Sequence, residues 1–199
     1  MSSVDSKIQK AKAGDGQALD LLLARYRNYL AVLVSMSNRG GKRLQSRFDA
    51  SDVVQNTMLD AFKDFAEFQG NTEPELLAWL RKVLAYNLAD LVREHHAEKR
   101  DVKRQVEWVE SLSQSSQRLQ RLVPHNRDQP RHYYSRQEVV VMLADALAKL
   151  PDDYRLVIVM RHLHKASFNE IGDHMGRSAG AVRMLWARAV GSLRVINAE

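Results

Sequence analysis

The sequence predicts an all-α protein of two helical domains joined by a flexible linker, with a helix-turn-helix in the C-terminal domain. Apolar residues recur at helical spacing nearly throughout, and no strand-like alternation or Asn-Gly hairpin signal competes with that pattern. The composition shifts to serine, glutamine and proline at about 102–134. We therefore predict domains at 1–101 and 135–199, and a linker over 102–134 with at most a short helix around Trp108.

Composition limits the class of protein. With 199 residues, 45% of them hydrophobic, the chain can bury a core, and the absence of cysteine excludes disulfides, thiolate metal sites and cysteine nucleophiles. Apolar runs such as 139–143 fall far below the roughly 20 residues that span a bilayer. The first residues also lack the apolar core of a signal peptide. We expect a cytoplasmic protein with no membrane insertion.

Charge is unevenly distributed along the chain. The net charge is +6, but residues 49–75 carry seven acids against one base, whereas residues 176–194 carry four bases and no acid. This asymmetry indicates two macromolecular partners, one of them polyanionic.

Two helical blocks are expected in the N-terminal domain. Residues 7–36 predict one or two helices that end at the turn-rich stretch 38–41. A further helix begins near Asp49, which can serve as its N-cap, while Phe48 can pack onto Val53. Its expected core stripe is Val54, Met58, Ala61 and Phe65, and its opposite face presents Asp52, Asn56, Leu59 and Lys63, with Gln55 beside them.

The segment 75–96 predicts a second well-defined helix. A leucine stripe should be buried, and the opposite face combines aromatic and basic residues, which suits unpaired bases because rings stack on bases and cations follow phosphates. The alternative is that the aromatic rings pack against a neighbouring helix. The expected stripe is Leu77, Leu80, Leu84, Leu88 and Leu91, and the opposite face is Lys82, Tyr86, Ala89 and Arg93, adjoined by Trp79.

The C-terminal domain shows helix boundaries clearly. Apolar residues at helical spacing run from Val139 to Leu150, and a helix from Asp152 toward Leu163 follows Pro151. Ser167 and Glu170 form the pattern of a capping box, Gly176 ends that short helix, and Ser178 can cap the next one. Helix, tight turn and helix in this order predict a helix-turn-helix.

The last helix has a core face and a basic face. Projected at 100° per residue, Val182, Leu185, Trp186, Ala189 and Leu193 share one stripe. Opposite them lies a low ridge of Gly180, Ala187 and Gly191, flanked by Arg183, Arg188 and Arg194. An exposed helical glycine costs about 1 kcal/mol relative to alanine, so close approach to another surface, such as the DNA major groove, would explain it. The alternative is that the arginines form an ordinary solvated surface and that Gly191 only begins the termination of the helix.

Several short motifs together resemble one family, the extracytoplasmic-function (ECF) sigma factors of bacterial RNA polymerase. They are Asp-Ala-Ser-Asp-Val-Val-Gln-Asn at 49–56, Ala-Trp-Leu at 78–80, Asn-Leu-Ala-Asp at 87–90, Leu-Pro-Asp-Asp-Tyr-Arg at 150–155 and Glu-Ile-Gly at 170–172. The resemblance covers almost the whole chain.

The resemblance implies a role for each domain. The helix at 49–65 would bind a coiled coil in the largest subunits of the polymerase core, with Asp52, Gln55, Asn56 and Leu59 as candidate contacts. The segment from 68 and the following helix would melt and hold the minus-ten element, through Asn71, Trp79, Lys82, Tyr86, Asn87 and Arg93. The last helix would recognise the minus-thirty-five element, through Arg177, Ser178, Ala181, Arg183 and Arg188. An anti-sigma partner is a further family expectation.

The chain departs from the family pattern at two places. Gly-Ala-Val-Arg-Met-Leu at 180–185 stands where the family usually shows glycine, threonine, valine, a basic residue, serine and arginine. Gly172 replaces the usual alanine, and we expect it to loosen the first helix of the motif slightly.

Catalysis and cofactors are not expected. Neither His95 and His96 nor His162 and His164 have the spacing that places two ligands on one helical face, and no phosphate-binding glycine loop or HExxH occurs. Two alternatives to a sigma factor remain open from the residues alone. One is a stand-alone helix-turn-helix regulator of transcription, and the other is a helical adaptor that binds only proteins.

Overall fold

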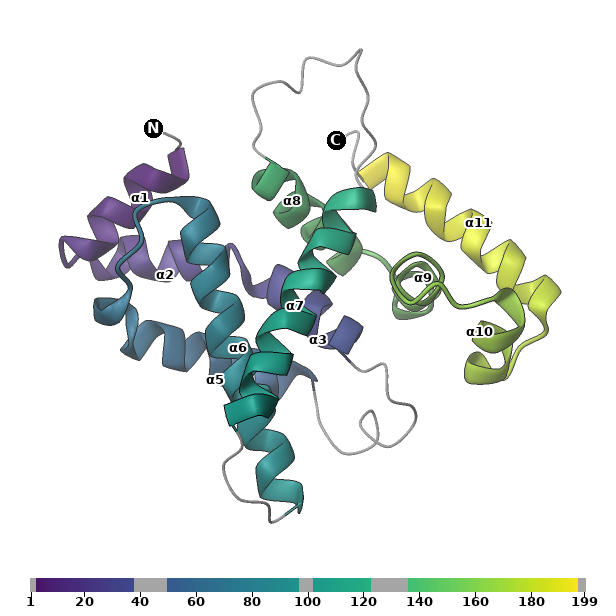
Figure 1. The fold of residues 1–199 in the computed structure, drawn as a ribbon. Coiled ribbons are helices and arrows are strands. Elements are labelled where there is room, and N and C mark those ends of the chain that lie inside the picture. The colour runs from purple at the N-terminus through teal and green to yellow at the C-terminus, as the bar shows by residue number, and fades with distance from the viewer. Residues whose placement is uncertain (1–2, 38–49, 97–101, 123–135, 197–199) are drawn as a thin grey trace. The chain divides into compact units, whose positions relative to one another are not determined.

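A computed structural model describes residues 3–37, 50–96, 102–122 and 136–196 of the chain. These residues form helices joined by short turns, and no strand occurs among them. The chain divides into two compact units, Met1–Ser116 and Gln117–Glu199 (Figure 1). The predicted all-α class with a C-terminal helix-turn-helix is confirmed.

The N-terminal unit begins with three helices, where the sequence predicted one or two. They are α1 (Ser3–Lys12), α2 (Gly16–Ala24) and α3 (Arg27–Ser37). The first break occurs because Gly14 adopts a left-handed φ of 93° and the Asp15 carboxylate then accepts a 2.9 Å hydrogen bond from the Ala18 amide. The expected turn at 38–41 lies outside the described residues.

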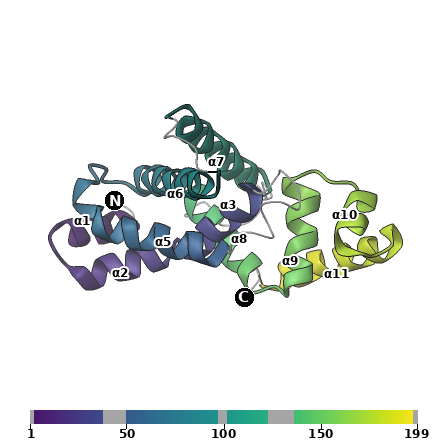
Figure 2. The same cartoon turned by 90° about the horizontal axis from the view of Figure 1, so that it is seen from below.

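The centre of this unit is a helix pair, α5 (Ala50–Lys63) and α6 (Glu73–His96), joined through a short 3₁₀ turn, η1 (Phe65–Glu67). Helices α2 and α3 contact α5, and α1 contacts α6 (Figure 2). The predicted core stripe of α5 is confirmed at Val54, Ala61 and Phe65, while Met58 is half-buried. The proposed capping by Phe48 and Asp49 lies outside the described residues.

A buried carboxylate holds the start of α6 in place. Glu73 is 2% exposed, and its Oε1 accepts a 2.9 Å hydrogen bond from the Tyr26 hydroxyl. Burial, followed by the nearby Glu73 charge, raises the pKa of Tyr26, so the phenol keeps the proton that it donates. The Glu73 amide donates to Asp5 Oδ1 over 3.2 Å, which ties α6 to α1 as well.

The predicted linker is wrong over its first part, because α7 (Val102–Leu122) is a continuous helix. Composition suggested a linker, but both prolines of the stretch, Pro124 and Pro130, follow α7. Within the helix, Leu112, the buried Ser115 and Ser116, and Leu119 recur at three- to four-residue spacing. The remainder, residues 123–135, lies outside the described residues.

Helix α7 is fixed to the N-terminal unit by a polar relay. The Tyr29 hydroxyl donates to Ser116 Oγ over 3.0 Å and accepts from Arg81 Nη1 over 2.9 Å. Tyr29 is fully buried, so the relay satisfies a hydroxyl that would otherwise be costly to bury. It joins α3, α6 and α7.

The C-terminal unit contains α8 (Arg136–Ala148), α9 (Asp152–Ile158), a π-helical continuation of α9, η3 (Val159–Leu163), α10 (Phe168–Met175) and α11 (Ala179–Ile196). Helix α11 packs on α9 and α10. Val182 and Ala189 are fully buried, whereas Leu185, Trp186 and Leu193 of the predicted core stripe are half-buried.

The caps of the helix-turn-helix form as the sequence predicts. Ser167 Oγ accepts from the Glu170 amide over 3.2 Å, and the Glu170 carboxylate accepts from the Ser167 amide over 2.7 Å. These bonds lower the pKa of Glu170. Gly176 ends α10 with a left-handed φ of 66°, and Ser178 Oγ accepts from the Ala181 amide over 3.3 Å.

Gly172 permits a close backbone approach within the motif, and its expected loosening of α10 stays a prediction. The Arg177 amide donates to the Gly172 carbonyl oxygen over 2.9 Å, so the turn folds back onto α10 at this residue. A Cβ atom at position 172 would lie 2.5 Å from the Arg177 carbonyl oxygen. The absence of a side chain therefore permits this close backbone approach.

Gly172→Ala should destabilise the C-terminal unit by about 1–3 kcal/mol, because a rigid backbone atom must shift to admit the methyl group. Gly191→Ala is the matched control: it lies on an exposed face of α11 with open space around it, so it should leave stability unchanged or raise it by up to about 1 kcal/mol. Thermal denaturation and hydrogen exchange of α10 peptides measure both effects. Equal protection of α10 in the two variants would contradict the close approach.

Candidate nucleic-acid interface

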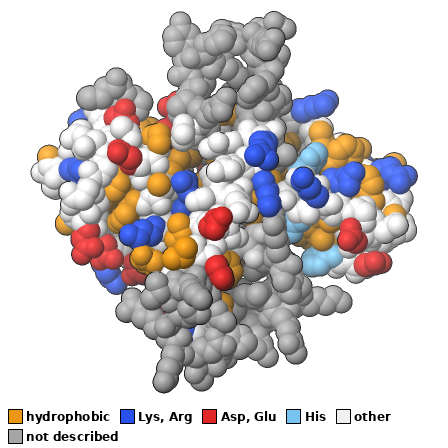
Figure 3. Space-filling model, in the orientation of Figure 1, with side chains coloured by type: hydrophobic (Ala, Val, Ile, Leu, Met, Phe, Trp, Pro, Cys, Tyr) orange, Lys and Arg blue, Asp and Glu red, His pale blue; other side chains and the backbone are white. Residues whose placement is uncertain are grey.

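The basic face of α11 is exposed as predicted. Arg183, Arg188 and Arg194 all reach solvent, and none has an acidic partner among the residues that the structure describes. Lysine and arginine side chains spread across the visible face of this unit beside histidine and apolar atoms (Figure 3). Gly180, Ala187 and Gly191 are exposed between the arginines. The face therefore combines low relief with uncompensated positive charge.

Two of the predicted minus-thirty-five contacts have internal partners. Arg177 Nη2 lies 2.6 Å from Asp153 Oδ2, so this guanidinium connects the turn to the start of α9. Ser178 Oγ is occupied by the capping bond from Ala181. Both residues are exposed, as is Ala181, but a contact by Arg177 to DNA would compete with its ion pair.

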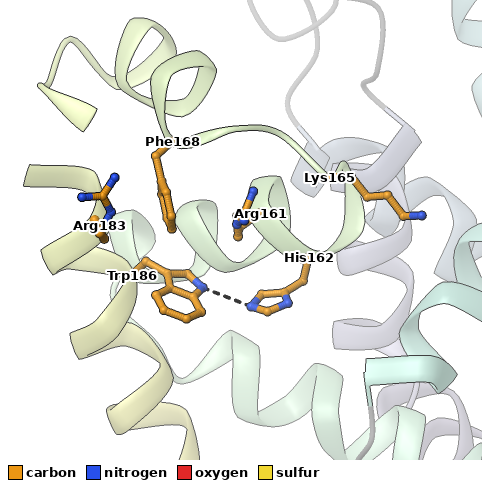
Figure 4. A pocket seen from close by; sticks show the side chains of 6 residues that line it. All are labelled: Arg161, His162, Lys165, Phe168, Arg183 and Trp186. Carbon is orange, nitrogen blue, oxygen red and sulfur yellow. Dashed lines mark hydrogen bonds between the residues drawn. The ribbon is translucent and has the colours of Figure 1, made fainter. Parts of the chain in front are cut away.

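Arg183 also forms one wall of an open pocket of about 490 Å³ between η3, α10 and α11. Arg161 and Arg183 lie on either side of the Phe168 ring, with guanidinium carbons 4.6 and 5.4 Å from its centroid (Figure 4). Lys165 completes a lining that contains three basic side chains and no acidic one: Arg161, His162, Lys165, Phe168, Arg183 and Trp186.

A histidine and a tryptophan close one side of this pocket. Trp186 Nε1 donates a 3.0 Å hydrogen bond to His162 Nε2, and the rings stack with centroids 5.9 Å apart (Figure 4). The indole can only donate, so this nitrogen of His162 carries no proton. Burial, followed by the Arg161 charge, lowers the pKa of His162 and favours the same neutral form.

Sequence inspection missed the basic side chains that η3 and the following turn contribute. Arg161 falls on a segment that seemed only to continue α9, and its Nη1 donates to the Ala166 carbonyl oxygen over 2.9 Å. Lys165 adopts a left-handed φ of 58°, which is rare outside glycine and asparagine. The sequence carried a signal in Arg-His-Leu-His-Lys at 161–165, which is rich in basic residues directly before the capping box.

On α6, the two aromatic candidates differ in their surroundings. Trp79 is half-buried and packs against Phe68, with centroids 5.4 Å apart, and against Phe65 at 6.0 Å. Tyr86 is 40% exposed and has the Lys82 ammonium 5.7 Å from its ring centroid. The alternative of packing within the fold thus holds for Trp79, while Tyr86 is exposed with a cation over its ring.

The other predicted minus-ten residues of α6 are partly engaged. Asn87 Nδ2 donates to the Val83 carbonyl oxygen over 3.3 Å and to Thr57 Oγ1 over 3.5 Å, and Arg93 pairs with Asp90 at 3.1 Å. Ala89 was expected on the open face, but it is 7% exposed. The prediction was wrong because Ala85 and Ala89 form a second buried row, which widens the packed face of α6 beyond the leucine stripe.

Asn71 lies in the exposed loop that precedes α6. Its backbone amide donates to Glu75 Oε2 over 2.8 Å, and its side-chain oxygen accepts hydrogen bonds from α1. Hydrogen bonds from Asn71 and Thr72 lower the pKa of Glu75, so the carboxylate stays ionised and holds the loop at the start of α6.

The predicted polymerase-binding face of α5 is solvent-exposed. Leu59 is 50% exposed, and Asp52, Gln55 and Asn56 are exposed as well. Phe62, which sequence inspection did not single out, is 47% exposed three residues after Leu59. Leu59 and Phe62 thus place two large apolar side chains on an otherwise polar, exposed helix face.

Within the described ranges, no group of three or more histidine or acidic side chains has the geometry to hold a metal ion. None of the described helices is long and apolar enough to cross a membrane.

Comparison with known proteins follows the same division of the chain. Residues 146–195 match the family model described as Sigma-70, region 4. The ECF RNA polymerase sigma-E factor of Haemophilus influenzae is 25% identical over 184 residues, covering 92% of this chain and 88% of that relative. RNA polymerase sigma factor YlaC of Bacillus subtilis is 27% identical over 167 residues, covering 82% and 84%.

One solved structure, an RsbN-BldN complex, matches 95% of this chain and 98% of the other chain at 19% identity, with a TM-score of 0.32.

These comparisons confirm the predicted resemblance: the chain is similar to ECF sigma factors of bacterial RNA polymerase over most of its length. It acts with that enzyme in promoter-specific transcription, and a stand-alone regulator is not favoured. Sigma factors are transcription initiation factors and are not catalysts in themselves.

The stability of the C-terminal unit should fall as the pH drops below about 6.5, the ordinary pKa of histidine. The folded protein favours neutral His162, so its lowered pKa contributes stability above that pH, which is lost as the ring becomes protonated. His162→Gln keeps an acceptor for the Trp186 indole but cannot titrate. Thermal denaturation between pH 7.5 and 5 should show a smaller loss for this variant, and parallel curves would contradict the assignment.

Proposed function

We propose that the two units divide promoter recognition between them. The C-terminal unit places α11 in the major groove of the minus-thirty-five element, and the N-terminal unit holds the melted minus-ten element against α6. The exposed face of α5 binds a coiled coil of the largest subunits of polymerase core. An anti-sigma factor would act by covering one of these surfaces.

The observation that carries the C-terminal assignment is the unpaired basic face of a helix-turn-helix. Arg183 and Arg188 project from α11 without acidic partners among the described side chains, and Arg161 and Lys165 extend the positive charge beyond the helix. Cations that are not neutralised within the protein suit a polyanion, because contact with phosphates releases condensed counterions. Arg183 reaches bases from α11, and Lys165 reaches the phosphate backbone.

For the N-terminal unit, the proposal is supported by α6, which carries some exposed side chains and others that make contacts within the protein. Tyr86 and Lys82 offer a ring and a cation to a single strand, while Asn71 offers a polar contact from the preceding loop. Trp79 is held on the same helix by its packing against Phe65 and Phe68. Asn87 and Arg93 must exchange internal bonds for contacts with DNA.

Run-off transcription with purified polymerase core tests the proposal as a whole. Core with the full chain should start transcripts at a set of genomic promoters that core alone ignores. If the chain binds no core and starts no transcript, the proposal fails. If it binds duplex DNA in the same way with and without core, the stand-alone regulator is the better account.

Arg183→Ala should cost about 1–3 kcal/mol in binding to the preferred minus-thirty-five sequence and reduce discrimination at one position. Lys165→Gln is the matched comparison. It should weaken binding equally for all sequences and lower the slope of log affinity against log salt by about 1. Binding titrations of holoenzyme at several salt concentrations separate the two patterns, and a uniform loss for Arg183→Ala would make it a phosphate contact.

Tyr86→Ala should impair strand opening with little effect on stability, because the ring is 40% exposed and base stacking contributes roughly 1–3 kcal/mol per base. Trp79→Ala should also lower the free energy of unfolding, by at least about 1 kcal/mol, because it removes two aromatic contacts. Permanganate footprinting reports opening and thermal denaturation reports stability. A Tyr86→Ala variant that opens promoters normally would contradict the stacking role.

A further inference from the structure

The side chain of Asn71 is held by helix α1. Gln9 Nε2 donates to Asn71 Oδ1 over 3.1 Å, and Lys12 Nζ donates to the same oxygen over 3.2 Å. Gln9 and Lys12 are three residues apart and therefore lie on one face of α1. The Asn71 backbone amide is bound to Glu75, so the backbone and the side chain of this loop residue are both fixed.

These contacts determine which end of the amide faces outward. A lysine ammonium can only donate, so the atom beside Lys12 must be the carbonyl oxygen and not the amide nitrogen. That oxygen has two lone pairs, and the two donors from α1 occupy both. No described residue accepts from the Asn71 amide nitrogen, whose two N–H groups are left to face an incoming ligand.

Lys12 is itself held in position. Its ammonium lies 5.5 Å from the centroid of the Phe68 ring, and its charge contributes to the lowered pKa of Glu75. The lysine ammonium therefore lies over the Phe68 ring and close enough to Glu75 for its charge to act on that carboxylate. An anchored donor of this kind loses little further entropy when it keeps Asn71 in one orientation.

We propose that Gln9 and Lys12 are positioning residues that make Asn71 a donor-only contact. The loop would then select, at the minus-ten position that Asn71 meets, a base with a carbonyl oxygen (thymine or guanine) over one with an amino group at the same ring position (cytosine or adenine). A free asparagine can instead pair with adenine through its oxygen and its nitrogen together. This inference rests on the proposed contact between Asn71 and the melted strand.

The test measures open-complex formation by holoenzyme on promoters that carry each of the four bases at every minus-ten position. The wild-type protein should prefer thymine or guanine at one position. In Gln9→Leu/Lys12→Met the amide can rotate and accept, so that preference should shrink by roughly fivefold, the equivalent of one hydrogen bond. Lys12→Arg retains a donor and should keep the preference.

Lys10→Met is the matched control, because it removes one positive charge from the same helix at an exposed residue that makes no contact with Asn71. It should leave the base preference unchanged. Thermal denaturation should show that all these surface variants fold as the wild type does.

Asn71→Ala separates the two levels of the inference. It should abolish the preference at the same position. If Asn71→Ala changes neither opening nor preference at any position, the proposed contact with DNA fails and the positioning role fails with it. If Asn71→Ala removes the preference while Gln9→Leu/Lys12→Met retains it in full, Asn71 contacts the base but α1 does not determine its choice. A wild-type preference for adenine or cytosine at that position would also overturn the proposal.

Discussion

The close backbone approach at Gly172 is the constraint on which the C-terminal unit depends. A helix-turn-helix places its second helix through the geometry of the turn, and here the Arg177 amide folds back onto the Gly172 carbonyl oxygen. Gly176 in the left-handed region and the caps at Ser167 and Ser178 fix the rest of the path. These local bonds set the path of the chain from α10 into α11, and the packing of α11 on α9 completes the placement of Arg183.

The N-terminal unit achieves its geometry in the opposite way, through contacts distant in sequence. The start of α6 is held by Tyr26 and Asp5 through Glu73, and the loop before it is held by α1 through Asn71. If this surface captures flexible single-stranded DNA, as proposed, it gains affinity because its own side chains are already ordered. Tyr86 remains exposed, whereas Trp79 packs against Phe68.

Features set by neighbouring residues could be predicted from the sequence, whereas contacts between helices distant in the sequence could not. The capping box at Ser167, the glycine turn at Gly176 and the exposed arginines depend on neighbours within a few residues, so spacing predicts them. Helix α7 was missed because serine and glutamine resemble a linker until Tyr29, from a distant helix, provides a partner for Ser116. The ring contacts of Trp79 and the hydrogen bonds from α1 to Asn71 also join residues from different segments of the chain. Helical periodicity does not show that such residues are neighbours.

The opposite charges of α5 and α11 bear on how one small chain can hold two partners together. Asp52 and Asp64 are exposed on or directly after α5, so a DNA phosphate near that face would meet like charge. The unpaired arginines of α11 favour DNA and disfavour basic protein surfaces. In the proposed division neither partner would replace the other, and each unit would need to bind only weakly because the covalent connection raises the effective concentration of the second contact. Under the proposed division, salt should weaken the DNA contact more steeply, since counterion release applies there, whereas Leu59 and Phe62 would offer polymerase apolar area that salt does not screen.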